Sequence, residues 1–175
     1  MKITRFVANR AFRMLGSMAL GYLEEDILEA TTMNMLALRK VVNDLEALKK
    51  ELFVRLYGNP DNMDEEQSKR LADFFDILSK MKGPEQEKTD ELEALARESF
   101  PDLYKLRKKE LNVITSLLNK EVEVDLVPID EKKFIKGILK GKQTAQVNDI
   151  CLLFGFMFIQ EADEETNLSE LDEIL

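Results

Sequence analysis

Apolar residues recur at helical spacing along most of the chain, and the clearest example is the stretch from residue 23 to residue 58. Large apolar side chains follow one another there at alternating intervals of three and four residues, which is typical of a helix that packs along one seam. The members of this helix seam are Leu38, Val41, Leu45, Leu48 and Leu52. The pattern predicts one long helix, and its seam serves either the chain's own core or a homodimer interface.

Two polar residues interrupt the same stripe. Continuing the register backwards from Leu38 places Ile27, Thr31 and Asn34 on the seam. Polar residues at such positions can fix the register of packing. The other interpretation is that they lie where the packing partner ends.

Shorter amphipathic helices are expected downstream of the long one. One begins after Asp64, a predicted N-cap with Gln67 three residues later, and another covers residues 101–120. A third covers residues 130–141, where the side chains expected to face the core are Phe134, Ile135, Ile138 and Leu139. The apolar run 150–159 predicts a buried helix, with a central strand as the alternative.

One stretch breaks the helical pattern. Residues 119–130 read NKEVEVDLVPID, in which charged and apolar side chains alternate. A period of two predicts a half-buried strand with Val122, Val124 and Leu126 on its inner side. Because a single strand leaves its backbone unpaired, we expect Lys2–Val7 to pair with Glu121–Val127. The alternative is an open edge that pairs with another molecule.

Together these patterns predict a mainly α fold, a long helical hairpin or bundle with a minor two-stranded β element. One helical domain is expected over residues 1–160, because four prolines and seven glycines leave little room for a long flexible linker. Residues 161–175 are expected to form an acidic C-terminal tail. No apolar run reaches the ~20 residues of a membrane-spanning helix, so no membrane association is expected.

Charge changes this picture mainly at the C-terminal end. The formal net charge is −9, and seven acidic residues follow Gln160 without any Lys or Arg. The rest of the chain has 27 acidic and 25 basic residues and is nearly neutral. Nucleic-acid-binding proteins need a basic excess, so no nucleic-acid partner is expected. The basic clusters at residues 107–109 and 132–142 are expected to be solvated faces that partly pair with nearby acids.

The residue types and motifs in the sequence are compatible with few kinds of catalytic site. The sequence contains no histidine, which removes the commonest general base and histidine-based zinc sites. It also lacks the glycine-rich motifs of nucleotide-binding sites. Glu24, Glu25 and Asp26 lie where a helix begins, so solvated capping explains them better than catalysis. We therefore expect no enzymatic activity, no metal and no cofactor.

The order of segments carries a resemblance. The matching parts are the run LLNKEVEVDLVPI at residues 117–129, which follows a long helix, and TAQVNDICLLFGFMF at residues 144–158. In this order the chain resembles a family of small proteins of unknown function that are encoded by phages of Gram-positive bacteria. The resemblance implies a role in phage biology and brings no catalytic residues. The single cysteine, Cys151, favours a reducing compartment, so we expect the cytoplasm, which is that of the host for a phage protein.

The acidic tail is the leading candidate for partner binding. Apolar residues recur at helical spacing among its acids, which is typical of a segment that folds into a groove. The candidate partner-binding residues are Glu164, Glu165, Leu168, Leu171, Ile174 and Leu175. A helix docked on the chain's own core and a solvated end are the alternatives. The expected function is that of a non-enzymatic protein-binding protein, such as a phage accessory or host-interaction factor, and a structural component of a phage particle or other assembly is the alternative.

Overall fold

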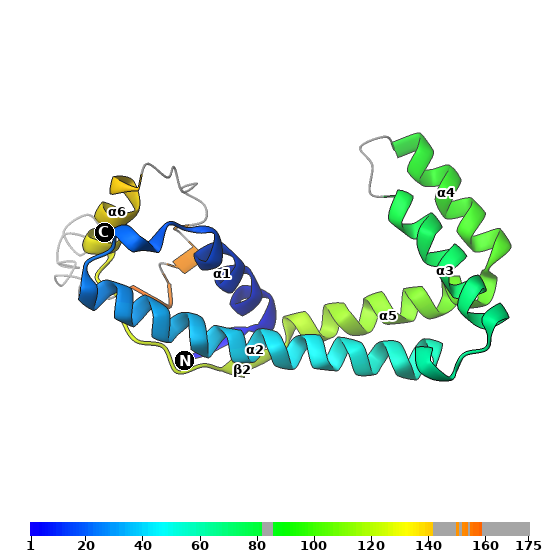
Figure 1. Cartoon of the computed structure of the whole chain (residues 1–175), viewed down its shortest axis with the longest axis horizontal. Helices are drawn as coiled ribbons and strands as arrows, with labels where there is room; N and C mark the ends of the chain where they lie inside the picture. Colours follow the sequence, from blue (N-terminus) through cyan, green and yellow to red (C-terminus); the bar gives the residue numbers. More distant parts are fainter. Residues whose placement is uncertain (82–85, 142–149, 151, 154, 159–175) are drawn as a thin grey trace, which may run out of the picture. The chain divides into compact units, whose positions relative to one another are not determined.

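The structure is a computed structural model that describes residues 1–81, 86–141, 150, 152–153 and 155–158 (Figure 1). Across these residues the chain is mainly helical and has a small antiparallel sheet, so the predicted mainly α fold with a minor two-stranded element is confirmed. The chain forms two compact units. The first combines residues 1–43 with the described residues from 121 onward, and the second is Asp44–Lys120.

The first unit is assembled from the beginning and the late part of the chain. Strand β1 (Lys2–Thr4) leads directly into helix α1 (Arg5–Ser17). A short 3-10 helix, η1 (Leu20–Tyr22), precedes the long helix α2 (Glu25–Tyr57), whose first part belongs to this unit. Strand β2 (Glu121–Glu123) then returns to the same unit and pairs with β1.

The two strands pair antiparallel, with Lys2 opposite Glu123. The pairing extends by one residue beyond the sheet. The backbone N–H of Val124 donates to the carbonyl of Met1 at 2.8 Å, and the amine of Met1 donates to the carbonyl of Val124 at 2.9 Å. Val124 is buried whereas Glu121 and Glu123 are exposed, as the alternating pattern predicts. The predicted pairing between the start of the chain and this late stretch is therefore confirmed.

The first strand is shorter than the predicted Lys2–Val7. The side chain of Thr4 accepts a hydrogen bond from the backbone N–H of Val7 at 3.2 Å and thereby caps α1. Residues 5–7 are consequently the first turn of a helix. The β-branched and aromatic composition that favoured a strand here gives way to the capping hydroxyl.

The second strand is also shorter than the predicted Glu121–Val127. At Val127 the backbone bonds to a side chain of α2 and not to a neighbouring strand. The amide nitrogen Nδ2 of Asn34, in α2, donates to the carbonyl of Val127 at 2.8 Å. Its Oδ1 accepts from the backbone N–H of Val127 at 2.7 Å. Asn34 is fully buried, and so is Thr31, whose hydroxyl donates to the carbonyl of Ile27 at 2.6 Å. The polar interruption of the stripe therefore positions the chain that follows β2.

Helix α6 (Glu131–Lys140) packs on the core of the first unit through one side only. Phe134, Gly137 and Ile138 are buried on that side. The expectation that Leu139 also faces the core is wrong, because this side chain is 63% exposed. Each residue turns an α-helix by about 100°, so Leu139 points well away from the direction that Ile138 takes.

The second unit begins with the remainder of α2. It continues through η2 (Pro60–Asn62), α3 (Glu65–Lys80), α4 (Gln86–Ser99) and α5 (Pro101–Asn119). Helix α2 stops before Gly58, whose φ of 97° lies in the left-handed region that favours glycine. The glycine thus lets the chain turn from α2 toward η2.

Aromatic side chains form the centre of the second unit. Phe74, on α3, is fully buried, and its ring centroid lies 5.5 Å from that of Phe75 and 5.8 Å from that of Phe100. Both pairs meet edge to face, an arrangement that aromatic rings prefer. Ala96, Leu103 and Tyr104 complete the buried cluster. This unit therefore has a hydrophobic core of its own.

Candidate functional site

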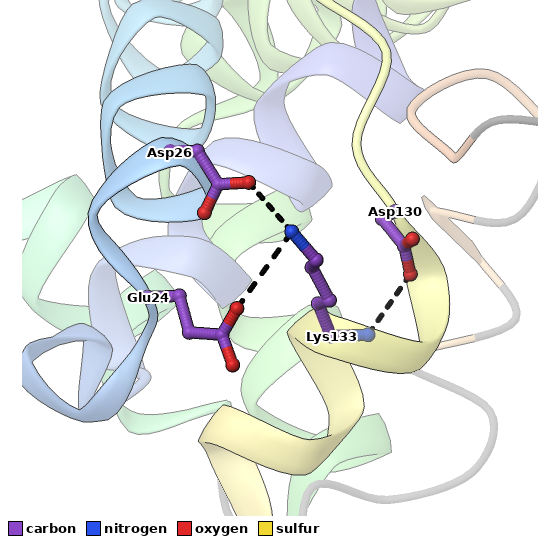
Figure 2. A network of polar contacts seen from close by, with 4 residues as sticks. All are labelled: Glu24, Asp26, Asp130 and Lys133. Carbon is purple, nitrogen blue, oxygen red and sulfur yellow. Dashed lines mark hydrogen bonds and ion pairs between the residues drawn. The ribbon is translucent and has the colours of Figure 1, made fainter.

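A polar network holds α6 against the start of α2 (Figure 2). The ammonium Nζ of Lys133 lies 2.8 Å from Oδ2 of Asp26 and 3.7 Å from Oε2 of Glu24. Asp130 caps α6, because its Oδ1 accepts from the backbone N–H of Lys133 at 3.0 Å. The hydrogen bond from Lys133 lowers the pKa of Asp26, and the same bond raises the pKa of Lys133. Since these side chains are largely exposed, the network orients α6 and adds little stability.

The inner side of α6 is fully used by the fold. A Cβ on Gly137 would lie 2.6 Å from Cδ2 of Leu23 and 3.1 Å from the carbonyl oxygen of Tyr22. Only a glycine lets α6 approach η1 and the start of α2 this closely. On the same side, the ring of Phe134 lies 5.5 Å from the ring of Phe158. A partner of α6 must therefore use the opposite side of the helix.

That opposite side carries a shallow groove of about 590 Å³, which we call the lysine-rimmed groove. It is lined by Lys132, Ile135, Lys136, Leu139 and Lys140. The two apolar residues lie one helical turn apart, and the three lysines follow one another at intervals of four residues along the same side. Leu139 is one of the most exposed large apolar residues that the structure describes. An exposed leucine beside a half-buried isoleucine, bordered by one sign of charge, is typical of a surface that binds an amphipathic segment of opposite charge.

The second unit carries a more polar cavity of about 550 Å³. It is lined by Tyr57, Gly58, Asn59, Asn62, Met63, Glu66, Gln67, Arg70, Leu71 and Leu103. Several of its polar groups already have partners in the fold. Oδ1 of Asn59 accepts from the backbone N–H of Asp61 at 3.2 Å, and the guanidinium of Arg70 bonds both carboxylate oxygens of Asp102 at 2.5 and 3.0 Å. The cavity therefore offers a ligand fewer free polar groups than its lining suggests.

A buried acid lies close to this cavity. Glu110 is 7% exposed, and its Oε2 accepts from the hydroxyl of Tyr57 at 2.9 Å and from Nη1 of Arg107 at 2.5 Å. Burial, and then the hydrogen bond to Glu110, raise the pKa of Tyr57 well above its ordinary value. The carboxylate is thus paired with both a phenol and a guanidinium. Such a satisfied network is structural, and it offers no free general base.

The raised pKa of Tyr57 makes stability depend on pH at alkaline values. A phenol whose pKa is raised on folding contributes stability that is present below about pH 10 and is lost as the pH rises through the folded-state pKa. Tyr57→Phe is expected to lower the free energy of unfolding by about 1–2 kcal/mol at neutral pH, because Glu110 loses a hydrogen-bond donor. It should also flatten the loss of stability between about pH 10 and about pH 12, because phenylalanine has no proton to lose. Urea unfolding across this range measures both effects.

The control Tyr22→Phe, at an exposed tyrosine, should stay within about 0.5 kcal/mol of the wild type at neutral pH. Equal alkaline losses in the wild type and Tyr57→Phe would contradict the assignment.

The predicted helix seam lies mostly inside the chain. Leu38 and Leu45 are fully buried and Val41 is 9% exposed, whereas Leu48 and Leu52 are half-buried. Leu38 and Val41 pack in the core of the first unit. This part of the seam is therefore core, and it is not available to a second copy of the chain.

The predicted partner-binding residues of the tail, from Glu164 to Leu175, lie outside the described residues, and so does Cys151. Glu25 and Asp26 lie in the first turn of α2, as predicted. Among the described residues, no group of three or more acidic or cysteine side chains is arranged to hold a metal ion. None of the described helices is both long enough and apolar enough to cross a membrane.

Comparison of the chain with protein-family models, with curated proteins and with solved structures found no match. The resemblance to phage-encoded proteins therefore stays a prediction. What the chain does must be inferred from its own surfaces, and the lysine-rimmed groove is the strongest candidate among those described.

Proposed function

We propose that the protein is a non-enzymatic protein-binding protein whose lysine-rimmed groove receives an acidic amphipathic helix of a partner protein. The observation that carries the proposal is the exposure of Leu139 between Lys136 and Lys140, on a helix whose other side is buried. A helix already ordered by its inner side has no structural need for a second apolar stripe. The partner would come from the phage or its host if the resemblance in sequence reflects common origin.

The groove combines two attractions that favour one kind of partner. Covering Ile135 and Leu139 removes apolar surface from water, at roughly 25 cal/mol per Å². The aliphatic stems of the lysines extend that apolar surface, while their ammonium groups remain at the rim. Acidic residues on either side of a partner's apolar stripe would meet these ammonium groups. A basic helix would bring like charges together, so the groove selects against it.

The groove is also held rigid before a partner arrives. Gly137 lies tightly against Leu23 and Tyr22, and Lys133 is bonded to Asp26. A preformed helix does not lose conformational entropy again when it binds. The contacts on the inner side of α6 therefore raise the affinity of the outer side.

A synthetic amphipathic helix with leucine on one side and glutamate on the other provides the test. Its binding to the full chain is measured by fluorescence anisotropy, together with that of a helix in which lysine replaces glutamate. We expect binding of the glutamate helix only, and weaker binding at higher salt because screening reduces the attraction. Leu139→Ser combined with Lys136→Gln should weaken it by roughly tenfold or more, which corresponds to about 1.4 kcal/mol.

The matched control changes an exposed leucine and an exposed lysine on α4. Leu95→Ser combined with Lys88→Gln makes the same chemical changes in the second unit and should leave the affinity unchanged. Equal binding of the glutamate and lysine helices would overturn the proposal. So would equal affinity of the groove variant and the control variant.

A further inference from the structure

We infer that the first occupant of the lysine-rimmed groove is the chain's own acidic C-terminal segment, residues 161–175, which covers the groove until a partner displaces it. The inference rests on the proposed function, because it concerns the same groove. Three independent features of the chain carry it: the place where the described chain ends, the length that follows, and the chemistry of the segment.

The described chain ends beside α6. The backbone N–H of Ile129 donates to the carbonyl of Met157 at 2.8 Å, and Ile129 also forms a parallel bridge with Phe158. The ring of Phe158 packs against that of Phe134, at 5.5 Å between centroids, and Phe134 belongs to α6. The last described residue, Phe158, therefore lies next to the helix that carries the groove.

The remaining length is sufficient to reach and cover the groove. The groove runs from Lys132 to Lys140, which is about 12 Å along a helix at 1.5 Å per residue. Residues 159–163 can span up to about 17 Å when extended. Residues 164–175 would form a helix about 18 Å long, which is longer than the groove.

The segment has the chemistry that the groove selects. It contains seven acidic residues and neither lysine nor arginine, so every charged side chain it has is attracted to the lysine rim. Its large apolar residues are Leu168, Leu171, Ile174 and Leu175, which recur at helical spacing. They would cover Ile135 and Leu139. The segment is thus the acidic amphipathic helix that the proposed function requires of a partner.

Attachment to the same chain gives the segment an advantage over any free partner. A tethered ligand has an effective concentration in the millimolar range when its linker is short and flexible. Contacts too weak to hold a free peptide can therefore keep the groove covered. A free partner must bind the groove tightly enough to displace the tethered segment. The segment therefore sets the minimum affinity that a partner needs.

Carbodiimide cross-linking of the full chain, read by mass spectrometry, tests this contact. The reagent joins a lysine amine to a carboxylate that already touches it. We expect Lys136 and Lys140 to link to acidic residues of the segment within one chain. The yield should exceed that of the exposed Lys40 and Lys50 of α2 by roughly tenfold, since docking concentrates the segment at one place.

A matched pair of full-chain variants distinguishes docking through apolar contacts from attraction by charge alone. Leu171→Asp combined with Ile174→Asp removes two apolar contacts, and it should abolish the preference for Lys136 and Lys140. Thr166→Asp combined with Asn167→Asp adds the same number of carboxylates but keeps the apolar side, so the preference should persist. Wild-type links spread evenly over exposed lysines would overturn the inference. Links found only between two chains would overturn it as well, because a second copy would then be the occupant.

Repeating the anisotropy measurement on the same variants separates this inference from the proposed function. If the segment covers the groove, the glutamate helix binds Leu171→Asp/Ile174→Asp roughly tenfold or more tightly than the wild type. Equal binding to both forms, without preferred cross-links, leaves the proposed function standing and overturns the inference. Preferred cross-links without binding of the helix to any form would support the docked segment and overturn the proposed function.

Discussion

Replacing Phe74 with alanine is expected to lower the free energy of unfolding by about 3–5 kcal/mol. The side chain is fully buried, and it meets Phe75 and Phe100 edge to face at 5.5 and 5.8 Å. Truncation removes the transfer free energy of a whole ring and leaves a cavity. The neighbouring rings cannot fill that cavity without leaving their favoured rotamers. Since these contacts lie within the second unit, the loss should appear first in that unit.

Two measurements check the result and its location. Denaturant unfolding followed by circular dichroism gives the change in free energy. Amide hydrogen exchange should show that α3, α4 and α5 lose protection at lower denaturant than α1 and α6 do. Phe6→Ala, at a residue of α1 that is 49% exposed, is the control and should cost about 1 kcal/mol or less. If the two alanine variants were equally stable, Phe74 would not be the centre of this core.

Elements whose cause is local could be predicted from the sequence. The length of α2 follows from a stripe at helical spacing, which Thr31 and Asn34 interrupt without ending the helix, and from a glycine at its end. The start of α3 follows from Asp64 and Gln67, which form the predicted capping box. Pairing of β1 with β2 could be predicted because the described chain has few stretches with a period of two. The strand ends were missed, since a hydroxyl at Thr4 outweighed the β propensity of the residues after it.

The candidate site was missed because it depends on which side of a short helix faces the core. Helix α6 has four large apolar residues in neighbouring directions around its axis, so composition assigns Ile135 and Leu139 to the core together with Phe134 and Ile138. The informative signal was Gly137, because a glycine inside a helix often marks a close approach. Taking Gly137 as the point of contact would have placed Leu139 outside. The lysines at intervals of four residues around it could then have been recognised as a rim.

The second large effect is expected at Asn34, in the first unit. Asn34→Leu should lower the free energy of unfolding by roughly 2–5 kcal/mol, because it leaves the N–H and the carbonyl of Val127 without partners. Leucine has a similar volume, so the loss is one of hydrogen bonding and not of packing. Asn43→Leu makes the same change at an exposed position of α2, and it should stay within about 0.5 kcal/mol of the wild type. Denaturant unfolding of the three proteins measures the difference.

Asn34→Asp gives a sharper form of the same test. An aspartate can still accept from the N–H of Val127, but it cannot donate to the carbonyl and it places a charge in a buried position. It should therefore be destabilised at neutral pH and recover part of the loss as the pH falls and the carboxyl becomes a donor. That recovery would be absent from Asn34→Leu, so it distinguishes a lost hydrogen bond from a change in packing. If Asn34→Leu were as stable as the wild type, packing alone would position the chain between β2 and α6. The asparagine on the leucine stripe would then be dispensable.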